Sequence, residues 1–403
     1  MNAQENPGKL QPAKLNWDRC ALFQAARRVV VKAGSGVVCN SSHEFDRQHI
    51  LPLVRDVAEL VLGGRQVVLV SSGAVTLGAA ALNLHRSRLR DASVTRACAA
   101  VGQCRLVEAY AEFFRPHGLK VAQVLVTEDD FTNHHRYRNL RQTFEKLLKL
   151  GAIPIVNEND TVSDFSSQAP AVFRDNDRLA ALLLSKLDAD ALVLLSNVDG
   201  LLDRLPSDAW QSQVISLVTE ITPEIRGSAS GVSATGRGGM ASKLQAAEIA
   251  MLAGGLTVIA NGKTAGILGE IFAGKPLGTL FLPRSRMAGK RRWLAFASTV
   301  RGRVTINANA CTALQSRHAS LLLSGVTSVD GTFAAGEVVF VLDSGGQIVG
   351  RGIAEFDSGR LAALLEHSRP VKGTLIRRER FLLHLPQQES ALRQPSEPAQ
   401  PEA

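Results

Sequence analysis

The sequence predicts an α/β protein: a three-layer α/β/α sandwich around a mostly parallel sheet, followed by a small β-rich domain. From residue 28 onward, short β-branched runs alternate with longer helical stretches, the pattern of a parallel sheet covered by helices on both faces. After residue 300 the helical period gives way to closely spaced strand and turn signals. Because crossovers between parallel strands are right-handed, the sandwich is the economical arrangement for the first part.

The expected elements follow one another in regular order. Strands are expected at 29–31, 66–70, 120–126, 153–156, 191–195 and 256–259. Helices are expected at 47–62, 91–114, 138–150, 177–187 and 240–253, with glycines at 63–64, 118, 151 and 254–255 as stop signals. In the β-rich domain the strand signals lie at 303–306, 324–329, 337–342 and 347–354.

Composition divides the chain into successive segments. The sandwich is followed by a crowded group of arginines and lysines, and the end of the chain is rich in Pro, Gln and Glu. We therefore expect a flexible extension over 1–26, the sandwich domain over 27–285, a basic linker over 286–299, the β-rich domain over 300–380 and a disordered tail over 381–403.

Bulk properties exclude several classes of protein. The five cysteines are an odd number without a Cys-x-x-Cys pair, which argues against a disulfide framework or a zinc site and favours the cytoplasm. No apolar run approaches the ~20 residues of a membrane span, and residues 1–26 lack the apolar core of a secretory signal. The net charge of +9 suits polyanionic partners, but the basic residues are spread along the chain as on a solvated surface.

Five polar, turn-rich clusters interrupt the apolar runs. They are VKAGSG (31–36), SSGA (71–74), NEND (157–160), DND (175–177) and GRGGMASK (236–243). Ligands of open α/β sheets bind beyond the carboxyl ends of the strands, so these clusters predict one shared site. Their lysines and glycines supply positive charge and exposed backbone amides, which indicates a phosphate group as ligand.

Each cluster also has a purely structural interpretation. Lys32 precedes its glycines, unlike the lysine of a Walker motif, and fits an ordinary strand-to-helix turn. Ser72 fits a tight turn with an N-cap serine, and Asp177 fits a helix N-cap. The last cluster fits a flexible loop with a solvated lysine, but Lys243 is expected in the first turn of a helix. There the positive end of the helix dipole disfavours a lysine unless an anionic ligand is bound.

Taken together, the motifs resemble the amino-acid kinase family and, within it, the glutamate 5-kinases, which open proline synthesis. The resemblance rests on VVVKAGS (29–35), VSSGAV (70–75), VNEND (156–160), DNDRLAA (175–181) and GGMASKLQAA (238–247), in the family's order. Residues 325–352 resemble the PUA domain that many bacterial members append. The resemblance covers about residues 27–380.

The resemblance implies transfer of a phosphoryl group from ATP to the γ-carboxylate of L-glutamate, with Mg²⁺ bridging the β- and γ-phosphates and no residue assigned as a metal ligand. It implies that Asp177 orients two catalytic lysines, Lys32 and Lys243. The glutamate-binding positions are Ser72, Asp160 and Asn176. The nucleotide-binding positions are Lys32, Gly34, Ser196, Asn197, Arg237, Gly238, Gly239, Met240, Ala241, Ser242 and Lys243.

This chemistry agrees with the residue types. The γ-carboxylate of glutamate ordinarily titrates with a pKa of about 4.3 and is ionised at neutral pH, so the reaction needs no general base. Phosphoryl transfer needs in-line placement and neutralisation of charge, and two lysines with a metal ion offset the repulsion between carboxylate and ATP.

Three positions depart from the family pattern. Asn197 stands where Asp is common, Arg174 where Gly is usual, and Leu202 where an aromatic residue is common. Asn197 removes a negative charge beside the nucleotide but keeps the capacity to hydrogen-bond a ribose or base. The departures therefore bear on nucleotide affinity rather than on the chemistry.

Two other functions remain open at this stage. A related kinase would use aspartate, N-acetylglutamate, carbamate or a nucleoside monophosphate as acceptor. An RNA-binding or regulatory PUA protein is disfavoured, because acidic and basic residues are mixed throughout residues 300–380. The resemblance further implies a homo-oligomer (dimer or tetramer), feedback inhibition by proline, and hand-over of the labile acyl phosphate to a glutamate 5-semialdehyde dehydrogenase.

Overall fold

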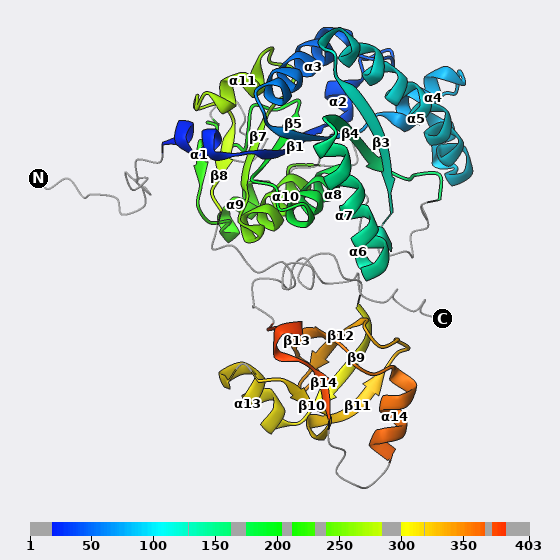
Figure 1. Cartoon of the computed structure of the whole chain (residues 1–403), viewed down its shortest axis with the longest axis vertical. Helices are drawn as coiled ribbons and strands as arrows, with labels where there is room; N and C mark the ends of the chain where they lie inside the picture. The colour runs from blue at the N-terminus through cyan, green and yellow to red at the C-terminus, as the bar shows by residue number, and fades with distance from the viewer. Residues whose placement is uncertain are drawn as a thin grey trace, which may run out of the picture.

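The computed structural model describes residues 18–127, 129–162, 175–203, 212–229, 239–283, 300–317, 319–366 and 373–383. Within these residues eight strands form one sheet in the order β3-β4-β2-β1-β5-β7-β8-β6 (Figure 1). Their bounds are β1 (Arg28–Ala33), β2 (Gln66–Ser71), β3 (Lys120–Val126), β4 (Ala152–Glu158), β5 (Ala191–Ser196), β6 (Leu217–Val218), β7 (Leu256–Asn261) and β8 (Thr279–Phe281).

The sheet is mostly parallel, as predicted. All pairings from β3 to β7 are parallel, whereas β8 runs antiparallel to β7 and pairs in parallel with β6. β1 lies at the centre, where Lys32 is in register with Val70 of β2 and Leu194 of β5. The carboxyl ends of β2, β1 and β5 therefore meet at one edge of the sheet.

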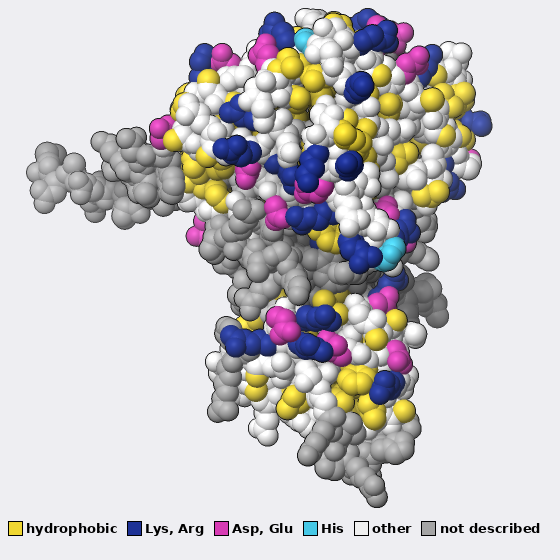
Figure 2. Space-filling model, viewed as in Figure 1, with side chains coloured by type: hydrophobic (Ala, Val, Ile, Leu, Met, Phe, Trp, Pro, Cys, Tyr) yellow, Lys and Arg dark blue, Asp and Glu magenta, His cyan; other side chains and the backbone are white. Residues whose placement is uncertain are grey.

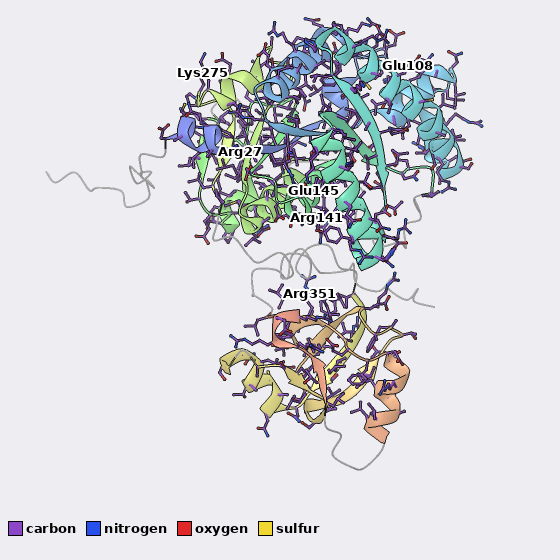
Figure 3. The ribbon with its side chains drawn as sticks, viewed as in Figure 1. Arg27, Glu108, Arg141, Glu145, Lys275 and Arg351 are labelled. Carbon is purple, nitrogen blue, oxygen red and sulfur yellow. The ribbon has the colours of Figure 1, made fainter. Side chains whose placement is uncertain are left out.

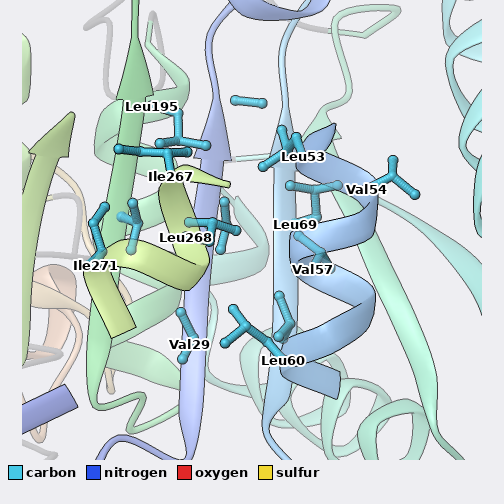
Figure 4. Packing of buried hydrophobic residues seen from close by; sticks show 14 of the residues in the cluster. Val29, Leu53, Val54, Val57, Leu60, Leu69, Leu195, Ile267, Leu268 and Ile271 are labelled. Carbon is cyan, nitrogen blue, oxygen red and sulfur yellow. The ribbon is translucent and has the colours of Figure 1, made fainter. Parts of the chain in front are cut away.

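Helices cover both faces of this sheet. On one face α1 (Arg19–Ala25), α3 (Arg47–Leu62), α5 (Ala92–Phe114) and α11 (Ile267–Phe272) pack against alternate strand residues such as Val29 and Val31. Figure 4 shows α3 and α11 lying over β1 and β2 in this cluster. On the other face α7 (His134–Lys149), α8 (Asn176–Lys186) and α10 (Met240–Ala253) pack against residues that include Val30. The three layers confirm the predicted fold class.

Ion pairs fasten the second helical layer to the sheet. Glu145 of α7 pairs with Arg28 at the start of β1, with 2.9 Å between Arg28 Nη1 and Glu145 Oε1. Arg141, one turn earlier, pairs with Asp188 just beyond α8 at 2.7 Å. Figure 3 shows Arg141 and Glu145 on the same stretch of α7. The first pair joins α7 to the central strand β1, and the second joins α7 to the end of α8.

Short helices connect the larger elements. They are α2 (Ser35–Val38), α4 (Ala74–Ala81), η1 (Arg86–Arg90), η2 (Arg115–His117), α6 (Asp129–Thr132) and α9 (Pro223–Ser228). None was predicted, because each is too short to show a helical period.

No helix among the described residues is long and apolar enough to cross a membrane.

A second sheet lies in the C-terminal part. Five strands in the order β11-β9-β12-β13-β15 surround a small core that includes Val304, Val339 and Val341. The strands are β9 (Val300–Ile306), β11 (Val326–Asp330), β12 (Val338–Leu342), β13 (Ile348–Ile353) and β15 (Phe381–Leu383), with a β10 (Leu321–Leu322) and β14 (Thr374–Ile376) pair beside them. The helices α13 (Ala308–Arg317) and α14 (Ser358–Glu366) and the 3-10 turns η4 (Leu323–Gly325) and η5 (Arg378–Arg380) complete this part.

The two parts of the molecule are in contact. Val338 of β12 is 2% exposed and belongs to the same buried cluster as residues of α8 and α10. Val300, Ile353 and Leu382 pack against that cluster from β9, β13 and β15. The second sheet therefore contacts the cluster formed by the layer of α7, α8 and α10, and it lies below this layer in Figure 1.

The ends of the chain differ from expectation where they are described. Residues 1–26 were expected to be a flexible extension, yet α1 forms within them and Phe23 is fully buried, its ring 5.3 Å from that of Phe272. The expected tail over 381–403 begins with the paired strand β15. Both segments are short and are ordered by tertiary packing, which local composition does not reveal. The expected linker over 286–299 lies outside the described residues.

Candidate active site

Two buried lysines share one buried carboxylate. Lys32 Nζ lies 2.5 Å from Asp177 Oδ1, and Lys243 Nζ donates to Asp177 Oδ2 at 2.8 Å. Lys32 and Lys243 are each 5% exposed and Asp177 is fully buried. The three residues come from β1, α8 and α10, which pack on one another. We call them the Lys-Asp-Lys triad.

The triad settles two of the structural interpretations. The first turn of α8 is capped by Asp175, whose Oδ1 accepts from the backbone N of Asp177 at 3.0 Å, so Asp177 is not the N-cap. Lys243 is not a solvated lysine near the start of α10, because Asp177 supplies the negative charge that its position requires. Ser242 Oγ, one residue earlier, lies 3.3 Å from Asp177 Oδ2.

The two carboxylates of this segment have opposite pKa shifts. Burial opposes ionisation of Asp177, but Lys32 and Lys243 outweigh it and hold its pKa below the ordinary value. For Asp175, burial and then repulsion from Asp177 raise the pKa, against a smaller opposing effect of Lys32. Ser242 also lies close enough to lower the pKa of Asp175, but no donor among the described residues meets the buried second oxygen, Oδ2, in hydrogen-bonding geometry. Asp175 thus offers a carboxylate oxygen for a cation.

Beside the triad lies a chain of side-chain amides, the amide network. Asn176 Nδ2 donates to Ser72 Oγ and to Asn157 Oδ1, both at 2.9 Å. Asn157 Nδ2 donates to Gln103 Oε1 at 3.0 Å. The network joins the loop after β2, the start of α8, the end of β4 and helix α5. Two predicted glutamate-binding residues, Ser72 and Asn176, are therefore in direct contact.

Gly73 explains how Ser72 reaches this network. The N-cap of α4 is Gly73, with φ of +112° and no side-chain cap, so the interpretation of Ser72 as an N-cap serine is wrong. A side chain at Gly73 would be strained by this backbone conformation and would lie 3.1 Å from Cys39 Sγ. The left-handed residue turns the chain into α4 immediately after Ser72.

The remaining predicted residues lie along the same edge. Gly34 N donates to Leu195 O at 3.2 Å, which brings the loop after β1 against the end of β5. There Ser196 is half-buried and Asn197 exposed, with 3.3 Å between Ser196 Oγ and Asn197 Oδ1. Asp160, half-buried, follows β4 by two residues. Gly239 is the N-cap of α10, whose first turn contains Met240, Ala241, Ser242 and Lys243.

Some predicted positions fall outside the described residues, and other candidate residues were missed. Arg237 and Gly238, and the departure at Arg174, lie in segments that are not described. Gln103 and Asp175 were not assigned roles. Asp175 belonged to a recognised motif, whereas Gln103 lies in the middle of a long helix and gave no sequence signal.

The donor set bears on whether the site could hold a metal ion. No group of three or more His, Cys, Asp or Glu side chains that could hold a metal ion occurs within the described ranges. Mg²⁺ commonly binds through one or two carboxylates together with substrate phosphates and water. The buried Asp175 Oδ2 is a carboxylate oxygen that would fit a magnesium ion bound in this way.

Comparison with known proteins agrees with this geometry. The model of the amino acid kinase family matches residues 27–261. The chain belongs to the amino acid kinase family. The triad and the amide network fall in the matched range, and the model of the PUA domain matches residues 302–369.

Within the amino acid kinase family, the relatives are glutamate 5-kinases. The chain is 42% identical over 357 residues to the glutamate 5-kinase of Myxococcus xanthus. The aligned segment covers 88% of this chain and 93% of the relative. It is 41% identical over 348 residues to the glutamate 5-kinase of Moorella thermoacetica, with 86% and 90% covered. The resemblance noted from the motifs is confirmed, and it extends through the PUA domain.

Proposed function

We infer that this member of the amino acid kinase family transfers the γ-phosphoryl group of ATP to the γ-carboxylate of L-glutamate, giving glutamyl 5-phosphate in the first step of proline biosynthesis. The Lys-Asp-Lys triad carries the inference. Two ammonium groups, 2.5 and 2.8 Å from one carboxylate, are held at the carboxyl edge of a parallel sheet. The names of the relatives support glutamate as the acceptor.

The triad fits the electrostatic demand of the reaction. The glutamate carboxylate and the ATP phosphates are both anionic, so their approach is opposed by repulsion. Lys32 and Lys243 supply positive charge that is already oriented and shielded from water, and charge held in this way stabilises a transition state without reorganisation. Asp177 orients both ammonium groups and remains ionised because its pKa is lowered.

Substrates are assigned to opposite sides of the triad. We propose that Ser72, Asp160 and Asn176 bind glutamate over β2 and β4. We assign the nucleotide to the edge over β5 and the start of α10, with contacts from Lys32, Gly34, Ser196, Asn197 and residues 237–243. The sheet order β4-β2-β1-β5 supports this division, because Lys32 on β1 stands between the two sides.

Magnesium would be held by the nucleotide phosphates and Asp175. When bound, the ion would neutralise part of the negative charge of the phosphates. Burial raises the pKa of Asp175, with a further contribution from Asp177, and an arriving cation favours the ionised form of this carboxyl. This assignment requires no further carboxylate from the chain.

The decisive test is an acceptor panel with hydroxylamine present. An acyl phosphate reacts with hydroxylamine to give a hydroxamate, so the product reports the bond that forms. The protein is incubated with Mg-ATP and L-glutamate, and in parallel with aspartate and N-acetylglutamate. We expect hydroxamate and ADP in equal amounts with glutamate alone. Hydroxamate with another acceptor, or ADP without hydroxamate, would reject glutamate phosphorylation.

Further properties are proposed by analogy with the glutamate 5-kinases. We propose a homo-oligomer, inhibition by proline and delivery of glutamyl 5-phosphate to a glutamate 5-semialdehyde dehydrogenase. A cytoplasmic location is supported by the five free cysteines, since a reducing compartment keeps thiols unpaired. We propose that the kinase part extends from α1 to about residue 285 rather than beginning at residue 27, and that the PUA part extends from residue 300 through β15 rather than ending at residue 380.

RNA binding is not proposed as a main function. Figure 2 shows basic and acidic side chains interspersed on the visible face of the PUA part. Several arginines there face carboxylates, such as Arg377 and Arg380 around Glu355 at 3.2 and 3.0 Å. A surface on which positive charge is locally neutralised lacks the electrostatic attraction that nucleic-acid binding needs.

A further inference from the structure

Gln103 is a buried amide that the proposed mechanism does not use. It lies on α5 with 6% of its surface exposed, and its Oε1 accepts a hydrogen bond from Asn157 at 3.0 Å. No hydrogen-bond acceptor for its Nε2 occurs among the described residues. The side chain is therefore a member of the amide network whose two N–H donors find no acceptor within the described part of the chain.

The orientation of this amide follows from the backbone. The backbone N of Glu158 can only donate, and it donates to Asn157 Oδ1 at 3.0 Å. The oxygen of Asn157 is thereby fixed, and its Nδ2 must face Gln103. Gln103 must then present its oxygen to Asn157, because two NH₂ groups cannot hydrogen-bond each other. The free group of Gln103 is a donor on chemical grounds.

An unsatisfied buried donor needs an explanation. Leaving one N–H of a buried amide without an acceptor is unfavourable, and native proteins seldom tolerate it without a ligand or water. Gln103 is connected through Asn157 and Asn176 to Ser72, at the edge where the acceptor substrate is assigned. A ligand that carries an oxygen acceptor would satisfy the donor.

The position of Gln103 selects which end of the substrate it meets. The triad lies at β1, whereas Asn157 lies on β4, beyond β2. Helix α5 packs on β3, the strand next to β4. The γ-carboxylate of glutamate must be near the triad to react, so the other end of the molecule points toward β4. That end carries an ammonium group, which only donates, and an α-carboxylate, which accepts.

We propose that Gln103 Nε2 donates a hydrogen bond to the α-carboxylate of the acceptor amino acid and so helps to determine substrate specificity. This rests on the proposed function, because it requires the γ-carboxylate to react. Gln103 is a binding residue for the end of glutamate that does not react. Its loss should raise the glutamate KM far more than it lowers kcat.

The test compares Gln103→Met and Gln103→Glu with the wild-type chain in the hydroxamate assay. Methionine keeps the length and removes both the donors and the oxygen that accepts from Asn157. Glutamate keeps an oxygen for Asn157 and replaces the donors by a negatively charged oxygen, which repels an α-carboxylate. We expect the glutamate KM to rise about 10- to 100-fold in both, the loss expected for a hydrogen bond to a charged group. The ATP KM should stay within about twofold.

A second readout does not depend on turnover. Glutamate added without ATP should raise the Tm of the wild-type chain, and we expect a smaller shift at equal glutamate concentration in both variants. Gln48→Met, at an exposed glutamine on α3, is the matched control and should behave as the wild type.

The outcomes separate this inference from the proposed function. A wild-type chain that forms no hydroxamate with glutamate rejects the function, and this inference with it. If the wild-type chain is active and both variants have a glutamate KM within about twofold of the wild-type value, only the role of Gln103 is rejected. Equal rises in the KM for glutamate and for ATP would also reject it, because they indicate a general distortion of the site.

Discussion

The sharing of Asp177 by two lysines determines how each residue of the triad responds to substitution. Removing one lysine leaves a lysine and a carboxylate that still form a buried pair. Removing the charge of Asp177 instead leaves two buried ammonium groups without their counter-ion, and unpaired buried charge is strongly destabilising. Substitution of either lysine should therefore lower activity with little loss of stability, whereas substitution of Asp177 should lower both.

Lys32→Met and Lys243→Met should each reduce kcat about 100- to 1,000-fold, the effect of removing one stabilising group from a transition state. Their Tm values should stay close to that of the wild type. Asp177→Asn should lose activity and also about 3–5 kcal/mol of stability. Steady-state kinetics and thermal unfolding measure the two effects, with Lys275→Met at an exposed lysine as control. Unchanged turnover in either lysine variant would contradict the assignment.

Asp175 should reduce the stability of the ligand-free protein at neutral pH. Burial, and then repulsion from Asp177, raises the pKa of Asp175 in the folded state. The contribution of Asp175 to folding stability is therefore fully present below the ordinary carboxyl pKa and is lost as the pH rises through the raised pKa. Asp175→Asn keeps an N-cap oxygen and removes the charge. We expect the variant to exceed the wild type in Tm at about pH 7.5, with the difference shrinking toward about pH 4. A difference that grows on acidification would show the opposite shift.

At the scale of elements, α4 and α5 approach so closely that only glycine fits. A Cβ at Gly78 would lie 1.8 Å from Cys98 O, and one at Gly102 would lie 1.7 Å from Ala74 O. Both distances are to backbone atoms, so a side chain could be accommodated only by moving a helix. The contact fixes α5, and with it Gln103, relative to the loop that contains Ser72.

Gly102→Ala should therefore destabilise the protein by about 3 kcal/mol, at the upper end of overpacking effects. The displaced helix should also raise the glutamate KM. Gly269→Ala in α11 is the matched control, since its new Cβ would have no atom within 4 Å and alanine favours a helix. Chemical denaturation of both variants measures the difference, and equal stabilities would show that α4 and α5 can separate without cost.

The sequence predicted the long elements and the lysines but not the network that joins them. α8 and α10 show helical periods, and the motifs around Lys32 and Lys243 brought together residues 211 positions apart. The separate roles of Asp175 and Asp177 depend on the angle at which α8 enters, which local sequence does not encode. The position of Gln103 depends on helix packing through Gly102, which local sequence does not reveal. Helix α13 was not predicted because it is short and only weakly amphipathic.

At the scale of the whole molecule, the PUA part packs on the layer that contains α8, the helix that carries Asp177. Val338 is buried in the shared cluster, and Arg351 of β13 is 8% exposed. Burial, with a contribution from Arg178 next to the triad, lowers the pKa of Arg351 to about 10. Arg178 lies in the first turn of α8, and its contribution to this shift indicates that the two arginines are close. Figure 3 shows Arg351 on the side of the second sheet that faces the first sheet.

Val338→Asp should separate the two parts while leaving each folded. A carboxylate in the apolar cluster is costly, so the open form should gain at least about tenfold in population. Trypsin should then cleave faster between residues 284 and 299, a segment rich in arginine and lysine. Leu322→Asp, at a residue 52% exposed on β10, provides the control and should be cleaved at the wild-type rate. Equal cleavage rates would mean that Val338 does not hold the parts together.

The helix α1 has a practical consequence for making fragments of this protein. The match to the kinase family begins at residue 27, which invites a fragment starting there. Such a fragment would lack Phe23 and Cys20, which cover Phe272 and the left-handed Gly274. The aromatic side chain exposed on α11 would form a hydrophobic surface patch that promotes aggregation during purification. A soluble kinase fragment should therefore begin at Asp18, the N-cap of α1.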